Sequence, residues 1–247
     1  MSDKFSSAPF YYRLFGDYAL FTDPVTKGGG EKFTYQIPTY QALKGITEQI
    51  YWKPTIQYFV DAVKILEPIQ TETKGVLAPL KNGKKDLNYY TYLKKVEYLV
   101  KVHFEWNELR QELENDRNEK KHEQIILRAL NRGGRRDIFL GTRECIGYVE
   151  RINKEDFESA ETPFDGKQIS YGIMFHSFVY PDEAYDEDTT NNLTSNFANI
   201  VMSNGRIDFV RPEECDIKQQ LRNYSIKAFD TDSINSVDKE WREVFNK

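Results

Sequence analysis

The chain has 247 residues, 39% of them hydrophobic and 14% aromatic, enough to bury the core of one large domain or two small ones. Its two cysteines exclude a disulfide framework. The lack of a long apolar run, and of a basic start followed by an apolar segment, predicts neither a membrane span nor a secretory signal, so we expect a cytoplasmic protein without membrane contact.

Charge is distributed unevenly along the chain. The total is −5, but residues 1–150 hold 23 Lys or Arg against 20 Asp or Glu, whereas residues 151–247 hold 11 against 19. The stretch 117–143 is the basic centre, with eight Lys or Arg against three acids. Because a local basic surface matters more for phosphate binding than the total charge, nucleic acid remains a candidate partner.

The first half of the chain alternates strand and helix patterns. Three segments rich in β-branched and aromatic residues predict strands: 11–21, 55–66 and 89–106. Thr39 is suited to cap a helix over 40–52, which the bond before Pro54 ends. The segment 67–87 contains several prolines and glycines and predicts turns.

A second helix opens on Lys121 and His122 and ends at Gly133-Gly134, and residues 143–151 predict a fourth strand. The resulting order β-α-β-β-α-β is that of the ferredoxin-like arrangement, which also underlies RRM domains. We therefore predict an α+β fold with a ferredoxin-like (RRM-like) RNA-binding and catalytic domain over 1–152.

Residues 153–247 predict an acidic C-terminal extension made mostly of antiparallel strands. The strand patterns lie at 170–180 and 199–210. Within the second, Ser203-Asn204-Gly205 is a hairpin turn signal. Other patterns predict an exposed acidic loop over 182–188, a short helix over 213–224 and a polar tail.

Lys121 and His122 place a cation and a titratable imidazole in the first turn of a helix, where free backbone N–H groups attract phosphate. Nearby cations favour the neutral imidazole. Further basic and glycine residues are suited to an RNA backbone: Arg117, Lys120, Arg132, Gly133, Gly134, Arg135 and Arg136. A structural histidine on a solvated basic helix fits the same pattern, and Tyr51 fits a core aromatic.

The sequence contains no convincing metal-binding pattern. Its three histidines are far apart and the acids of the first domain do not cluster, so we expect neither a metal nor a cofactor. The aromatic signature of sequence-reading RRM domains is also missing. RNA recognition is therefore expected to depend on backbone and shape more than on stacking.

Several segments closely resemble CRISPR-associated protein 5 of type I-C systems, the family member that processes precursor crRNA. The matching segments are 16–24, 29–54, 103–107, 115–122, 133–145 and 174–183. The resemblance implies an RRM-like domain with a C-terminal β extension. It also implies metal-independent cleavage at the base of the CRISPR repeat hairpin, with a 2′,3′-cyclic phosphate product.

The resemblance further implies which residues act. The family's catalytic tyrosine, lysine and histidine fall on Tyr51, Lys121 and His122, and its glycine-rich loop falls on 132–136. Lys84 and Lys85 fall in its thumb-like hairpin. The implied partners are the crRNA 5′ handle and the backbone and large subunits of Cascade, the interference complex.

Chemistry suggests roles for these residues without deciding between them. Lys121 suits stabilisation of the phosphorane charge, and His122 suits base or acid. Tyr51 would orient the 2′-OH, or act as base only if its pKa were lowered. A non-catalytic scaffold that caps crRNA is the alternative function, and binding of target DNA by the basic stretch is a third.

Overall fold

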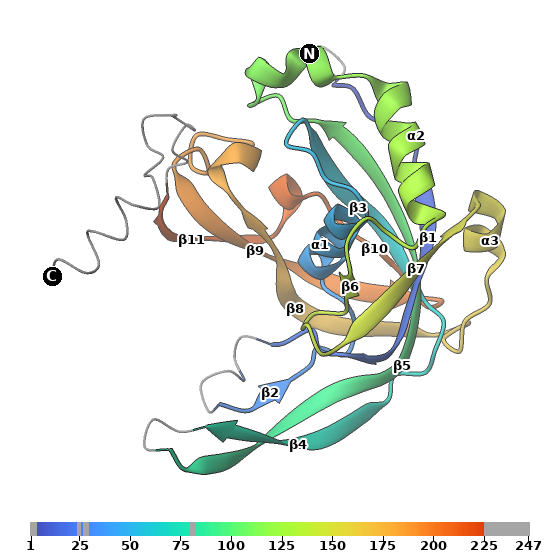
Figure 1. Cartoon of the computed structure of the whole chain (residues 1–247), viewed down its shortest axis with the longest axis vertical. Helices are drawn as coiled ribbons and strands as arrows, with labels where there is room; N and C mark the ends of the chain where they lie inside the picture. Colours follow the sequence, from blue (N-terminus) through green and yellow to red (C-terminus); the bar gives the residue numbers. More distant parts are fainter. Residues whose placement is uncertain (1–3, 24–25, 27–29, 80–82, 225–247) are drawn as a thin grey trace, which may run out of the picture.

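The computed structural model describes residues 4–23, 26, 30–79 and 83–224. These residues form a mixed fold in which a mostly antiparallel sheet predominates over a few helices (Figure 1). The strands are β1 (Phe10–Ala19), β2 (Lys32–Phe33), β3 (Ile56–Ile65), β4 (Thr71–Pro79), β5 (Lys85–Trp106), β6 (Ile138–Phe139), β7 (Ile146–Ile152), β8 (Gln168–Val179), β9 (Asn192–Ser203), β10 (Arg206–Asp208) and β11 (Ile217–Asn223).

The helices of the described residues are few and short. The α-helices are α1 (Tyr40–Ile50), α2 (Glu119–Leu130) and α3 (Lys154–Ser159), and the 3-10 helices are η2 (Gln111–Asp116), η3 (Pro181–Glu183) and η4 (Pro212–Glu214). Thr39 caps α1 as predicted, accepting a hydrogen bond from Ala42 N at 3.2 Å. Asn118 caps α2, so this helix begins slightly before the predicted opening at Lys121.

The sheet order is β11-β9-β10-β3-β5-β1-β7-β6, with β2 and β4 also paired to β5, and β8 paired to β9. Only the β2–β5 pair among these is parallel. β5 pairs with β3 and β1 through its second half, while its first half leaves the body of the molecule in a hairpin with β4 (Figure 1).

The prediction of turns over 67–87 is wrong for most of that segment, because β4 occupies residues 71–79. β4 pairs with β5 alone and is therefore an edge strand. An edge strand tolerates a proline such as Pro79, since a missing N–H on its outer side costs no ladder hydrogen bond. Residues 80–82 of the predicted basic turn tip lie outside the described residues.

The predicted helix over 213–224 is also wrong. Residues 212–214 form η4, and residues 217–223 form β11, which pairs with β9. No apolar stripe at helical spacing was available to bury, so pairing with β9 satisfies the backbone instead. The hairpin turn is confirmed: Asn204 and Gly205 have φ of 50° and 69° between β9 and β10.

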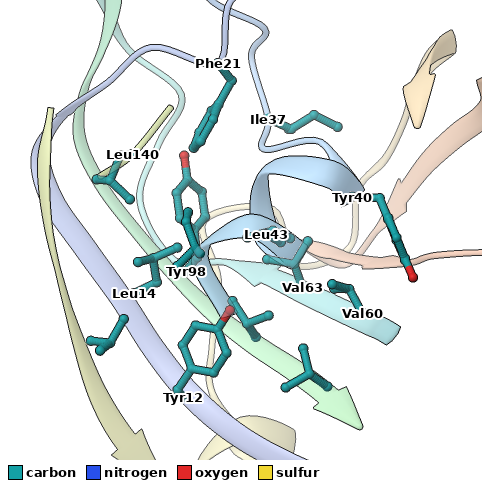
Figure 2. Close-up of a cluster of buried hydrophobic side chains, with 14 of the residues drawn as sticks. Tyr12, Leu14, Phe21, Ile37, Tyr40, Leu43, Val60, Val63, Tyr98 and Leu140 are labelled. Atoms are coloured by element: carbon teal, nitrogen blue, oxygen red, sulfur yellow. The ribbon is translucent and has the colours of Figure 1, made fainter. Parts of the chain in front are cut away.

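The core lies between α1 and one face of the sheet. Figure 2 shows Leu43 of α1 beside Val60 and Val63 of β3, with Tyr12 of β1 and Tyr98 of β5 on the other side of Leu43. All five are at most 2% exposed. The Tyr12 hydroxyl bonds to Thr47 Oγ1 of α1 at 2.9 Å, which fixes the helix on the strands. This packing positions the C-terminal end of α1, where Tyr51 follows.

The C-terminal strands extend the same sheet, because β10 pairs with β3. Arg211 crosses to Glu105 of β5 at 2.8 Å. The predicted acidic loop is only partly free, since Glu183 binds the buried Lys44 amine at 2.5 Å. The division into domains after residue 152 stays a prediction, and the predicted tail from 225 onward lies outside the described residues.

Candidate active site

Tyr51 lies immediately after α1, in an extended conformation with φ of −160°. Its N–H still bonds to Thr47 O, and its carbonyl accepts a hydrogen bond from the Tyr58 hydroxyl at 2.8 Å. The helix stops here because Pro54 disfavours helical geometry just upstream. As a result the Tyr51 ring leaves the axis of α1 and turns toward α2, where it is 2% exposed.

His122 lies in the first turn of α2 with its ring fully buried. Phe104 and Trp106 of β5 surround it edge-on, at ring-centroid distances of 6.3 and 5.6 Å. The side chain of Asn118 accepts a hydrogen bond from Lys121 N at 3.0 Å and sets the start of the helix. That start directs His122 inward and leaves Lys121 exposed.

A hydrogen-bond chain links these residues. The Tyr51 hydroxyl lies 2.9 Å from His122 Nδ1, and His122 Nε2 lies 2.9 Å from the backbone carbonyl oxygen of Asp116. A carbonyl can only accept, so Nε2 carries the proton, and in the neutral ring Nδ1 accepts from Tyr51. His122 therefore offers Tyr51 a proton acceptor already in place.

Asp116, the last residue of η2, joins the same cluster through its carboxylate. That carboxylate pairs with Lys121 Nζ and accepts a hydrogen bond from Thr55 Oγ1 at 2.7 Å. The hydrogen bonds from Lys121 and Thr55 lower the pKa of Asp116 to about 2. The carboxylate is thus ionised at neutral pH and neutralises Lys121. The sequence prediction missed both Asp116 and Thr55.

The pKa values of the two ring residues shift in directions that keep both groups neutral at rest and oppose proton transfer from Tyr51 to His122. Burial raises the pKa of Tyr51, Asp116 adds to the rise, and Arg135 opposes it. The lowering of the Tyr51 pKa that a free tyrosine base requires is therefore absent in this state. Burial also lowers the pKa of His122, with Lys121 acting in the same direction. The neutral imidazole is as predicted, with burial as the larger cause.

The glycine-rich loop 132–136 follows α2 and reaches the other side of Tyr51. Gly133 and Gly134 have φ of 79° and 102°, a backbone that other residues rarely adopt. Arg135 N donates to Ile50 O at 3.2 Å, and its guanidinium lies 5.5 Å from the centre of the Tyr51 ring. The loop therefore places a cation directly over the candidate tyrosine.

The basic residues predicted to bind RNA near this site differ in whether they are already paired within the protein. Arg132, Arg135 and Arg136 are exposed and form no ion pair with another described residue, and Lys120 is exposed on α2. Arg117 instead bonds to Asn107 O and pairs with Glu108, each at 3.1 Å.

Lys84 and Lys85 lie apart from this cluster. Lys85 opens β5, so both belong to the hairpin of β4 and β5. Figure 1 shows that hairpin at the opposite end of the molecule from η2 and the start of α2. Any RNA contact there is separate from Tyr51 and His122.

Two features are missing from the part of the chain that the structure describes: a cluster of side chains that could hold a metal ion, and a membrane-spanning helix. No three His, Cys, Asp or Glu side chains in the described ranges are grouped so as to hold a metal ion. No helix there is long and apolar enough to cross a membrane.

Comparison with known proteins gives the family. The Cas5d family, described as CRISPR-associated protein (Cas_Cas5), matches residues 11–210. A Mannheimia succiniciproducens protein named CRISPR pre-crRNA endoribonuclease Cas5d is 27% identical over 223 residues, covering 79% of this chain and 92% of that protein.

Two solved structures are also similar, and each comparison covers 88% of this chain and 100% of the other. One, described only as a CRISPR-associated protein, is 40% identical with a TM-score of 0.72. The other, a functionally uncharacterized protein from Streptococcus mutans, is 43% identical with a TM-score of 0.70. Since the family match spans most of its residues, the chain belongs to the Cas5d family, the CRISPR-associated protein 5 of type I-C systems.

Proposed function

We propose that this protein is a metal-independent endoribonuclease that cuts CRISPR repeat RNA at the base of its hairpin. The observation that carries the proposal is the Tyr51 hydroxyl held by His122 Nδ1, with Asp116 linking the Nε2 side of the same ring to the Lys121 amine. The family and the name of the Mannheimia relative support it. After cleavage the protein stays on the crRNA 5′ handle as a Cascade subunit, in contact with the backbone and large subunits in the cytoplasm.

The proposed fold of the catalytic part is ferredoxin-like and RRM-like. The chain order β1-α1-β3-β5-α2-β7 supports it, together with the sheet order β3-β5-β1-β7, in which every neighbouring pair is antiparallel. The helices of this unit bring Tyr51 and His122 together, one from the end of α1 and the other from the start of α2. We propose residues 1–152 as this domain and 153–247 as its β extension.

The proposed reaction is attack of an RNA 2′-oxygen on the adjacent phosphate. The 2′-O–P bond forms and the P–O5′ bond breaks, giving a 2′,3′-cyclic phosphate and a 5′-oxygen that takes its proton from water, while the proton removed from the 2′-OH returns to the solvent from His122. Tyr51 contacts the 2′-OH and takes its proton while passing its own to His122 Nδ1. His122 then acts through Tyr51, and Lys121 stabilises the charge on the phosphorane.

The substrate can reach Tyr51 only if its cover moves, because the ring is 2% exposed. The Arg135 guanidinium over that ring makes no ion pair with a described residue. A phosphate would attract it strongly. We propose that the RNA backbone draws Arg135 away, so that binding of the loop 132–136 uncovers the tyrosine.

A non-catalytic scaffold is the second candidate function, and the full burial of His122 favours it. A buried histidine with both ring nitrogens bonded is as well explained by packing as by catalysis. In that case the basic loop holds crRNA without cutting it. Duplex DNA, including target DNA, is a further candidate ligand of the same exposed arginines, since its phosphates offer the same charge.

The decisive experiment incubates the purified protein with its cognate repeat RNA in EDTA. The proposal expects a single cut at the hairpin base and a 2′,3′-cyclic phosphate end, and a repeat with an unpaired stem serves as control. A cut that appears only after a divalent cation is added would exclude the metal-independent mechanism. If the RNA is bound but never cut, the non-catalytic scaffold is the function that remains.

A further inference from the structure

A cavity of about 380 Å³ runs along one face of α1. Its floor is made of Ala42, Gly45 and Ile46 from that helix. Aromatic side chains stand on both sides: Phe139 of β6, and Phe175 and Phe178 of β8. The cavity is therefore an aromatic groove with a helix as its floor, and we call it the α1 groove.

Two glutamines of α1 hold the walls of the α1 groove in place. Gln49 Oε1 accepts a hydrogen bond from Phe139 N at 3.2 Å, and Gln41 Oε1 accepts one from Phe178 N at 3.1 Å. Each amide oxygen thereby accepts a hydrogen bond from the backbone of a groove wall, which leaves the amide NH₂ as a donor at the edge of the groove. The groove combines fixed aromatic rings with hydrogen-bond donors.

Gly45 is unfavourable for helix stability at its position. A glycine inside a helix costs about 1 kcal/mol relative to alanine. Here a Cβ would meet nothing within 4 Å, and the residue does not have a positive φ. Neither packing within the chain nor backbone geometry therefore explains the missing side chain. A ligand that approaches the helix closely does explain it.

The charge around the α1 groove indicates the kind of ligand. None of the described residues that line it is acidic. By contrast, a cavity of about 180 Å³ that reaches Tyr40 and Lys44 of α1 is lined by both acids and bases, among them Glu105, Glu183 and Arg211. The Arg143 guanidinium lies 5.8 Å from the Phe139 ring, and this exposed arginine has no ion pair with a described residue. The lining therefore carries no charge that would repel a phosphate, and Arg143 beside Phe139 can attract one.

We infer that the α1 groove binds unpaired nucleobases of the single-stranded RNA that flanks the repeat hairpin, stacked on Phe139, Phe175 and Phe178. Aromatic rings stack on any base, and arginines beside them hold the backbone. The groove ends at Gln49, two residues before Tyr51, and Arg135 binds the intervening Ile50. The inference rests on the proposed RNA substrate and adds a binding site for the flank.

The test variant is Gly45→Leu, which fills the groove from its floor. Because space is open there and leucine is a better helix former, its melting temperature should equal or exceed that of the wild type. Affinity is measured for two RNAs, a repeat hairpin with its single-stranded flanks and the same hairpin trimmed of them. We expect about a tenfold loss on the flanked RNA, from the stacking of one or two bases, and no loss on the trimmed one.

Gln124→Leu, which puts the same side chain on the exposed face of α2, is the matched control and should bind both RNAs normally. An unchanged affinity of Gly45→Leu for the flanked RNA would overturn the inference and leave a protein segment as the occupant of the groove. Equal losses on both RNAs would also overturn it. Cleavage is measured separately on the wild-type protein. If the wild type binds RNA but never cuts it, the proposed endoribonuclease activity is refuted, while the two affinities still show whether the α1 groove binds the flank.

Discussion

At the scale of single residues, Asp116 connects the parts of the candidate site. Its carbonyl sets the tautomer of His122, while its carboxylate occupies Lys121 and Thr55. The sequence prediction identified Tyr51, Lys121 and His122 through family resemblance, but Asp116 carried no signal. An acid just before a helix is common, and only the folded chain brings it against Thr55, 61 residues away.

The Asp116 carboxylate competes with RNA phosphate for Lys121, so Asp116→Asn should bind repeat RNA more tightly. Loss of one unit of negative charge near a phosphate corresponds to about 1 kcal/mol, or about fivefold in affinity. The pKa of about 2 means that this gain should be constant across pH 5–8. Equilibrium binding over that pH range checks it, and weaker binding would show that Asp116 supports the RNA site instead.

The proton acceptor in the proposed mechanism is neutral His122, which predicts the pH profile of cleavage. Burial lowers the pKa of His122, so the rate should fall only when the pH drops below about 6.5, the ordinary value for histidine. His122→Ala should cut about 10²–10⁴-fold more slowly and lose this acid limb. Single-turnover rates at several pH values test both. A variant that keeps the limb would assign it to another group.

At the scale of elements, patterns that depend on local chemistry were predicted well. The cap at Thr39 and the Asn204-Gly205 turn follow from backbone rules that act within a few residues. β4 and β11 were missed, because each is an exposed strand that exists through pairing with a distant partner. Their side chains bury little, so no periodic apolar pattern marks them.

One polar cluster links β3, β5 and the C-terminal extension. His103 of β5 bonds to Asp61 of β3 at 2.8 Å and lies 3.5 Å from Glu105, which in turn binds Arg211 of the C-terminal extension. Burial alone would lower the pKa of His103, but the hydrogen bonds to Asp61 and Glu105 outweigh it and raise the pKa to about 9. The charged imidazole therefore stabilises the folded protein.

Because the folded-state pKa is raised, this stabilisation is complete below pH 6.5 and disappears as the pH rises through about 9. His103→Gln should lower the free energy of unfolding by about 2 kcal/mol at pH 6 and by much less at pH 10. Urea unfolding of both proteins at the two pH values measures this. A loss independent of pH would mean that packing, and not charge, is what His103 contributes.

The loop 132–136 gives a prediction about salt. Arg135→Ala with Arg136→Ala should weaken RNA binding and lower the slope of log affinity against log salt by about 0.7 for each single-strand phosphate that the loop no longer binds. Replacing both arginines by lysine keeps the charge and should keep the slope. Titrations from low to moderate salt decide it. A slope unchanged in the alanine variant would place the loop away from the RNA backbone.

At the scale of the whole molecule, the chain combines a net charge of −5 with a basic stretch over residues 117–143. Arg13, Arg206 and Arg211 are ion-paired within the protein, whereas the arginines of the loop 132–136 have no described acidic partner. Composition revealed this polarity, but which cations remain available depends on side-chain contacts that a linear sequence does not contain. One of those available cations, Arg135, lies over the Tyr51 ring, and the Tyr51 hydroxyl is the group that we propose to meet the reacting atoms.

Tyr51→Phe removes that one oxygen and leaves the ring, the loop and Lys121 in place. The measurement is the single-turnover cleavage rate of the variant on the cognate repeat, with affinity and melting temperature taken on the same preparation. We predict a rate about 10²–10⁴-fold below that of the wild type. Affinity should be unchanged, and stability should fall by about 1 kcal/mol for the missing hydrogen bond to His122. Cleavage at the wild-type rate by the folded variant would contradict the proposed role of Tyr51.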